Sequence, residues 1–134
     1  MSYQKGEKDQ PLTGQTGTNM PEIPPFKFNA AANYDWDETL SFRAELIASD
    51  AWTNFDYENG EQELDAYGIL NLKGSKIWGD FELTVGVDNL FDKAYAVSNT
   101  YNDLILLPTL PGNNEVMLMN EPGRYFYTNL KYTF

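Results

Sequence analysis

The segment GRYFYTNLKYTF (residues 123–134) alternates in chemical character, and this alternation decides how the rest of the chain is interpreted. From Phe126 to Phe134 the even positions are mostly apolar or aromatic, whereas the odd positions from Tyr125 to Thr133 are more polar. A repeat of two residues is the period of a β-strand that presents one apolar and one polar face. We therefore predict a strand with two different faces at this end of the sequence.

Four earlier segments show the same period of two and predict an all-β fold. In FKFNAAANYDW (residues 26–36), for example, Phe28 and Tyr34 fall on one face and Asn29 and Asp35 on the other. We expect one antiparallel up-and-down meander of about five strands. The expected strands lie at about residues 26–36, 40–52, 64–78, 81–95 and 123–134.

The connections between these strands alternate in length. Residues 1–25 contain Gly and Pro without an apolar period, which predicts a polar loop or linker that leads into the first strand. Short turns are expected at residues 37–39 and 79–80, and long loops at residues 53–63 and 98–122. In an up-and-down sheet, the two long loops should therefore lie at one end and the two short turns at the other.

Composition excludes several classes of function. With 20 acidic and 9 basic residues, the net charge of -11 opposes binding to nucleic acid or to an anionic surface. The absence of Cys and His removes zinc fingers, thiol nucleophiles and the usual general base. The high aromatic share of 15% instead suits a boundary between apolar and aqueous surroundings. We expect no catalytic residue, metal site or cofactor.

The sequence predicts no membrane-spanning helix. The sequence has no apolar run long enough for a spanning helix. Its first residues are polar and lack the apolar centre of a secretory signal. If the protein acts outside the cytoplasm, we expect this sequence to be a fragment of a longer chain.

Four motifs carry a resemblance to a known family. They are PEIPPFKFNAAANY (residues 21–34), VDNLFDKAY (residues 87–95), Pro-Gly-Arg at residues 122–124 and the terminal Phe134. Together they resemble the C-terminal end of TonB-dependent outer-membrane receptors, from Pro21 onward. The resemblance implies the last strands of a 22-stranded plugged transmembrane β-barrel, without the plug and the earlier strands.

The resemblance also implies a function and a location. It indicates a transporter fragment in the outer membrane of a Gram-negative bacterium, for active uptake of a scarce nutrient such as a siderophore-iron complex or cobalamin. The implied partners are outer-membrane lipid and lipopolysaccharide, the barrel assembly machinery, the remainder of the receptor and, through the absent N-terminal region, TonB. Nucleic acid is not among them.

Some site residues follow from the resemblance. Leu130, Tyr132 and Phe134 correspond to the alternating signal that the assembly machinery reads in this family. The family-motif residues are Asn89, Leu90, Phe91, Asp92, Tyr95, Pro122, Gly123 and Arg124.

Other residues allow two interpretations each. Residues 89–92 could contact a ligand, but a bend held by Asn and Asp side chains is the preferred interpretation. Arg124 could meet lipopolysaccharide phosphates or simply keep the rim soluble. Residues 104–119 are unusually apolar for a loop and either line a ligand pocket or pack on a neighbouring loop. Tyr57 and Tyr101 are possible ligand contacts.

The acidic residues are also ambiguous. Asp56, Glu58, Glu61 and Glu63 could bind calcium, yet their spacing matches no EF-hand and a solvated loop is preferred. Glu45 and Glu82 could form an acid and base pair, although no His or pocket supports catalysis.

The rival function is a small soluble β-sheet protein whose apolar face binds a hydrophobic ligand. Closed barrels need about eight strands, and the sequence offers five. An open sheet would leave its edges and apolar face uncovered. Strands supplied by a second subunit remain a third possibility.

Overall fold

Five β-strands form one sheet in the computed structural model, and the described part of the chain contains no helix. Among these residues, no helix has the length and apolar character needed to cross a membrane. The structure describes residues 6–11, 13–14, 16–20, 23–56, 61, 63–97 and 120–134. The strands are β1 (Lys27–Asp37), β2 (Leu40–Ser49), β3 (Tyr67–Trp78), β4 (Phe81–Asp88) and β5 (Tyr125–Tyr132).

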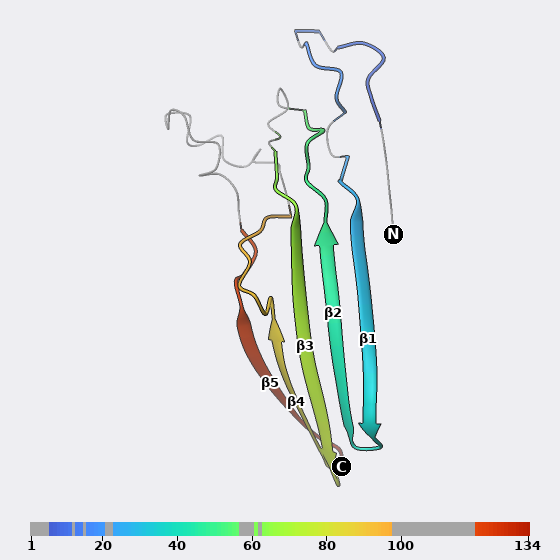
Figure 1. The fold of residues 1–134 in the computed structure, drawn as a ribbon, viewed down its shortest axis with the longest axis vertical. Coiled ribbons are helices and arrows are strands. Elements are labelled where there is room, and N and C mark those ends of the chain that lie inside the picture. The colour runs from blue at the N-terminus through green and yellow to red at the C-terminus, as the bar shows by residue number, and fades with distance from the viewer. Residues whose placement is uncertain are drawn as a thin grey trace. The chain divides into compact units, whose positions relative to one another are not determined.

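The strands follow one another in the sheet in the order of the chain, β1-β2-β3-β4-β5. Figure 1 shows them side by side as a meander, with β1 and β2 running in opposite directions. β4 pairs antiparallel with both β3 and β5. The predicted all-β meander is therefore confirmed.

Short turns join β1 to β2 and β3 to β4 at one end of the sheet. In the first turn, the Thr39 N–H donates to Asp37 Oδ1 over 2.7 Å, which closes the turn without a longer loop. In the second, Gly79 has a φ of 55°, a value that glycine adopts without steric cost. Because the strands alternate in direction, the connections from β2 to β3 and from β4 to β5 leave the sheet at its opposite end.

The strands are shorter than expected at the end where the long connections begin. β2 ends at Ser49 rather than near residue 52, β3 begins at Tyr67 rather than near residue 64, and β5 spans Tyr125–Tyr132. The largest correction concerns the strand expected at residues 81–95, since β4 already ends at Asp88. Asn89 follows with a φ of 51°, and a left-handed residue cannot continue a strand.

The chain divides into two compact units. One unit contains nearly all of the sheet, namely residues Phe28–Ala48, Tyr67–Ala94 and Pro122–Phe134. The other comprises Met1–Lys27, Ser49–Ala66 and Tyr95–Glu121.

The second unit has a small core of its own. Trp52, Leu64 and Ala96 are buried together, with Phe55 packed against them. Trp52 and Leu64 form an isolated antiparallel bridge and exchange backbone hydrogen bonds of 2.8 and 3.3 Å. The second strand expected at residues 40–52 therefore does not reach Trp52, because the Trp52 side chain joins this core instead.

Residues 1–25 form no strand in their described part. Glu7 and Asn19 make a single antiparallel bridge, and the Lys8 N–H donates to the Thr18 carbonyl over 2.7 Å. This segment contacts the connection that follows β2: Lys8 pairs with Asp56, and Asn19 Nδ2 donates to the Phe55 carbonyl over 2.9 Å.

Candidate functional site

The two faces of the sheet differ in chemistry. The strand register aligns Leu72 with Val87 and Val87 with Phe126, so apolar side chains from adjacent strands share a face. Ser75 and Thr84 are paired on the other face, where their hydroxyl groups lie 2.7 Å apart. The single apolar face predicted from the sequence is thus present in the sheet.

The apolar side chains of this face are largely accessible. Eight large apolar residues from the five strands illustrate this, since five of them are exposed and three are half-buried. A sheet that used this face as an interior core would bury them. The exposed members are Phe28, Phe42, Leu46, Val85 and Leu130, and the half-buried ones are Leu70, Leu72 and Leu83.

A groove of about 510 Å³ runs over the apolar face and contains residues from all five strands. Its apolar walls include Tyr34, Phe42, Leu72, Val85 and Phe126. Small residues such as Ala32, Ala44 and Gly74 also line it, so the groove lies where side chains contribute least volume.

Aromatic rings gather on the apolar face at the end of the sheet with the short turns. The rings of Phe81 and Tyr132, which are partners in the register, lie 4.8 Å apart. Tyr132 and Phe134 meet edge to face at 5.0 Å, and Tyr34 and Trp36 do so at 6.4 Å. Aromatic side chains in this position are typical of the interfacial girdle of a membrane barrel.

The predicted assembly-signal residues share this surface. Leu130, Tyr132 and Phe134 are all exposed and occupy alternating positions at the end of β5. Their role in assembly stays a prediction.

The opposite face carries a network of polar side chains. Arg43 donates from Nη1 to Asn33 Oδ1 over 3.0 Å and from Nη2 to Glu45 Oε1 over 3.3 Å. Lys131 lies 3.7 Å from Glu82 as an exposed ion pair across β4 and β5. Exposed pairs of this kind add at most about 1 kcal/mol, so they set the character of the face more than its stability.

Tyr127 crosses this polar face over a glycine. Gly86 is its register partner, and a Cβ at Gly86 would lie 2.3 Å from Tyr127 Cζ. The phenol ring can occupy that space only because Gly86 has no side chain. It thereby reaches a polar hollow of about 180 Å³ that Arg43, Glu45 and Asp88 also line. The sequence interpretation missed this arrangement, because an isolated glycine in a strand signals a close approach without naming the partner.

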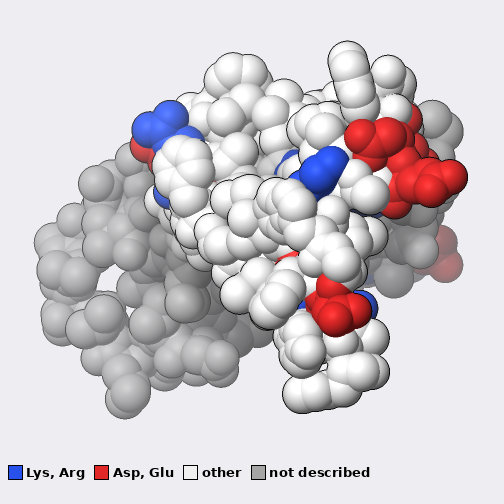
Figure 2. Space-filling model, turned by 90° about the horizontal axis from the view of Figure 1, so that it is seen from below, with Lys and Arg blue, Asp and Glu red and all other residues white. Residues whose placement is uncertain are grey.

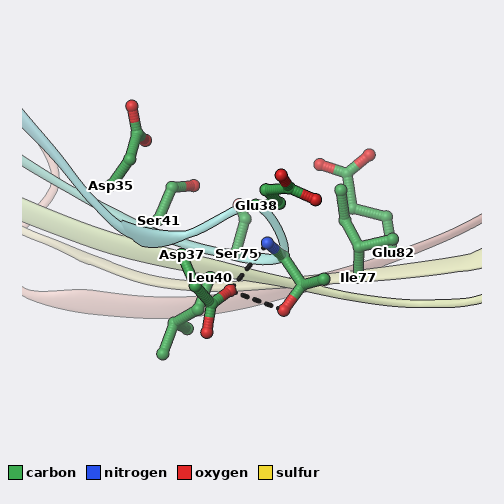
Figure 3. Close-up of a pocket in the computed structure, with 9 residues that line it drawn as sticks. Asp35, Asp37, Glu38, Leu40, Ser41, Ser75, Ile77 and Glu82 are labelled. Atoms are coloured by element: carbon green, nitrogen blue, oxygen red, sulfur yellow. Dashed lines mark hydrogen bonds between the residues drawn. The ribbon is translucent and has the colours of Figure 1, made fainter.

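A second polar hollow, of about 470 Å³, lies next to the turn between β1 and β2. Figure 3 shows Asp35 and Ser41 pointing to one side of the ribbon, whereas Asp37 and Leu40 point to the other. The Asp37 carboxylate accepts hydrogen bonds from Thr39 and lies 3.9 Å from Lys76 Nζ. Seen from this end, acidic side chains gather in groups with uncharged surface between them (Figure 2).

Acidic side chains are the candidates for acid–base chemistry or metal binding among the described residues. Glu45 and Glu82 share the polar face, but they line different hollows and each has a basic neighbour. In the part of the chain that the structure describes, no three His, Cys, Asp or Glu side chains come together to hold a metal ion.

The solvated-loop interpretation of the acidic segment is wrong for two of its residues. Asp56 is 3% exposed and Glu61 is fully buried. Glu61 Oε2 accepts a hydrogen bond of 2.7 Å from the Asp56 N–H, while Asp56 forms an ion pair with Lys8. Buried carboxylates persist when they are bonded in this way. Glu63 is exposed, and Glu58 lies outside the described residues.

Asn89 organises the turn that ends β4. Its side chain is 3% exposed and bonds Lys93 twice, accepting from the backbone N–H over 2.9 Å and donating to the carbonyl over 2.8 Å. Its own N–H donates to Asn71 Oδ1 over 2.9 Å. This geometry agrees with the interpretation of residues 89–92 as a bend held by side chains. Leu90 is half-buried, and Phe91 is exposed.

The same turn holds the chain where it returns to β5. Asn89 Nδ2 also lies 3.4 Å from the Pro122 carbonyl, and the Arg124 N–H donates to Asp92 Oδ1 over 2.8 Å. A Cβ at Gly123 would lie 2.7 Å from Asp92 Oδ1, so glycine leaves room for this carboxylate. The structure therefore brings the two predicted motifs together.

Most of the remaining predicted site residues lie outside the part of the chain that the structure describes. Tyr95 is half-buried, and its carbonyl accepts a hydrogen bond of 2.8 Å from the Glu121 N–H. Tyr57, Tyr101 and residues 104–119 lie outside the described residues, so their ligand contacts stay predictions.

A sheet with one exposed apolar face and one polar face is the arrangement of a segment of a transmembrane barrel wall. Comparison with known proteins identifies the family. The sequence model of the family described as TonB dependent receptor-like, beta-barrel, matches residues 1–90. The chain belongs to this family.

Two proteins illustrate the relationship. The chain is 26% identical over 129 residues to the ferric enterobactin receptor of Pseudomonas aeruginosa, which aligns 90% of this chain with 17% of that receptor. The structure matches that of the copper transporter OprC with a TM-score of 0.69 and 24% identity, covering 86% of this chain and 18% of that one. The second match shows a shared fold. The chain spans less than a fifth of the length of either protein.

Proposed function

We propose that this chain forms the C-terminal strands of a TonB-dependent receptor that imports a scarce nutrient across the outer membrane. The observation that carries the proposal is the exposed apolar face shared by all five strands, in a chain of this family. Lipid can cover such a face, and the rest of a barrel can pair with the edges of β1 and β5. The mechanism of such a receptor is binding and gated passage, without bond cleavage.

The rival function receives less support from the geometry. A small soluble binder would turn its apolar side chains toward an enclosed ligand. Here the apolar groove is open, and large side chains around it such as Phe126 are 75% exposed.

The nutrient we propose is a siderophore-iron complex, with cobalamin as the alternative. A relative that aligns with 90% of this chain is named as a ferric enterobactin receptor, which favours an iron chelate. We further propose that TonB, the plug and the earlier strands act through the rest of the receptor, and that the barrel assembly machinery recognises β5.

Nutrient uptake tests the proposal. In a strain that depends on the complete receptor, deletion of the gene should abolish transport of radiolabelled ferric enterobactin under iron limitation. Transport of radiolabelled cobalamin serves as the comparison, and deletion of TonB should have the same effect as deletion of the receptor. Finding the protein outside the outer-membrane fraction would contradict the proposed function itself. Normal iron uptake with impaired cobalamin uptake would contradict only the choice of nutrient.

A further inference from the structure

The segment before β1, residues 6–20, folds back on itself, and we call it the strap. Glu7 and Asn19 form an antiparallel bridge between its two arms. Beside this bridge, the Lys8 N–H donates to the Thr18 carbonyl over 2.7 Å. The strap therefore has backbone pairing of its own, although it contributes no strand to the sheet.

Each arm of the strap makes one contact with the connection between β2 and β3, residues 50–66. From the first arm, Lys8 forms an ion pair with Asp56, and the two side chains are only 12% and 2% exposed. From the second arm, Asn19 Nδ2 donates to the Phe55 carbonyl over 2.9 Å. The strap is thus attached to two consecutive residues of the connection.

Asp56 is also the residue at which the connection closes on itself. Its N–H donates to Glu61 Oε2 over 2.7 Å, and its carbonyl accepts from the Glu61 N–H over 3.2 Å. This closure buries both the Asp56 and the Glu61 carboxylates. Burial of a carboxylate is costly unless the group is hydrogen-bonded and its charge is paired. The strap supplies positive charge to this closure through the Lys8 ammonium group.

The Lys8–Asp56 pair joins two events that are far apart in the sequence. Withdrawal of the strap would leave the buried Asp56 carboxylate without this partner, and loss of one member of a buried ion pair is strongly destabilising. We propose that docking of the strap and closure of the connection form one conformational switch, which Lys8 couples. A partner that engages the strap would therefore open the connection. The switch goes beyond the proposed function, because it requires no nutrient.

Hydrogen–deuterium exchange of the complete receptor, purified in detergent, tests the coupling. Lys8→Met keeps an unbranched side chain and removes its charge. We expect the amides of residues 52–64 to exchange about tenfold faster in this variant, because closure loses its cation. Coupling between two sites is reciprocal, so Asp56→Asn should accelerate exchange in residues 6–11 of the strap.

A second pair of variants tests whether charge carries the coupling. Glu61→Gln keeps an oxygen acceptor for the Asp56 N–H and removes one buried negative charge. Added to Lys8→Met, this change should restore part of the protection of residues 52–64. Glu63→Gln is the matched control, because Glu63 is an exposed carboxylate of the same connection and should restore none.

Two further measurements separate the switch from general effects. Lys93→Met removes the charge of an exposed lysine outside the strap and the connection, and should leave exchange in residues 52–64 unchanged. The proposal would be overturned by unchanged exchange of these amides in Lys8→Met, or by an equal acceleration in β4. Equal recovery with Glu61→Gln and Glu63→Gln would also overturn it. None of these measurements involves transport, so their failure is distinguishable from failure of the proposed function.

Discussion

At the scale of single residues, the most constrained position is Asn89. Its φ of 51° ends β4, and its buried side chain joins the turn to Lys93 and to the returning chain at Pro122. Asparagine tolerates the left-handed conformation and can bond its own backbone surroundings, which few other residues do. The residue therefore fixes both ends of the connection between β4 and β5.

Substitution of this residue should have a large effect. In the complete receptor, Asn89→Ala would leave the Lys93 N–H without its acceptor and place an alanine, which tolerates the left-handed conformation less well than asparagine, at positive φ, a loss of about 2–4 kcal/mol. Asn89→Gly should lose less, because glycine accepts the backbone conformation. The free energy of unfolding in denaturant measures both. Asn129→Ala, at an exposed position on β5, should stay within about 0.5 kcal/mol, and an equally small loss in Asn89→Ala would refute the argument.

At the scale of elements, the eight residues of β5 make different contacts on the two faces of the sheet. Its apolar face carries Phe126 and Leu130, and Tyr132 joins the aromatic rings near the short turns. Its polar face extends Tyr127 over Gly86. In a closed barrel this strand would also pair with the first strand.

The assembly role assigned to the end of β5 can be tested directly. Phe134→Asp should cost little stability, because Phe134 is fully exposed beside Tyr132 at the boundary of the apolar face. In the complete receptor we nevertheless expect this change to reduce the folded barrel in outer-membrane fractions severalfold. The amount of heat-resistant folded protein on gels provides the measurement. Thr133→Asp is the matched control. Similar yields of folded barrel for both variants would mean that the alternation of apolar and polar residues at the end of the chain serves packing alone.

At the scale of the whole molecule, the sheet presents more apolar surface than a soluble protein tolerates. Trp36, Val85, Phe126 and Leu130 are all exposed on one face. The described sheet also has two free edges, β1 and β5. Edges of this kind template pairing with other chains, and exposed apolar faces associate.

The isolated 134-residue chain should therefore aggregate in plain buffer and disperse in detergent. Size-exclusion chromatography with light scattering, in buffer with and without detergent, measures this behaviour. Val85→Lys on the apolar face should reduce aggregation, whereas Asn129→Lys on the polar face should not. A monodisperse monomer in buffer that unfolds cooperatively would instead favour the soluble rival.

Much of the fold was accessible from the sequence because strand periodicity is local. Alternation assigned Tyr34 and Phe126 to the apolar faces of their strands, and both side chains line the groove on the apolar face of the sheet. The strand order agrees with the prediction that the two short turns leave the sheet at one end and the two long connections at the other. Alternation could not predict where each strand ends. β4 ends where Asn89 adopts a left-handed backbone conformation and its side chain bonds residues far along the chain.

The tertiary structure alone decided which polar groups are buried and which distant groups meet. Charge predicted that Asp56 and Glu61 would be solvated, but contacts with Lys8 and between the two residues bury them. Nothing local indicates that Tyr127 lies over Gly86, or that side chains from all five strands line one groove. The sequence by itself determined the two faces of the sheet, because side-chain direction depends on immediate neighbours. The pairing of strands determined which residues line the apolar groove and the polar hollows, because burial and proximity depend on residues far apart in the chain.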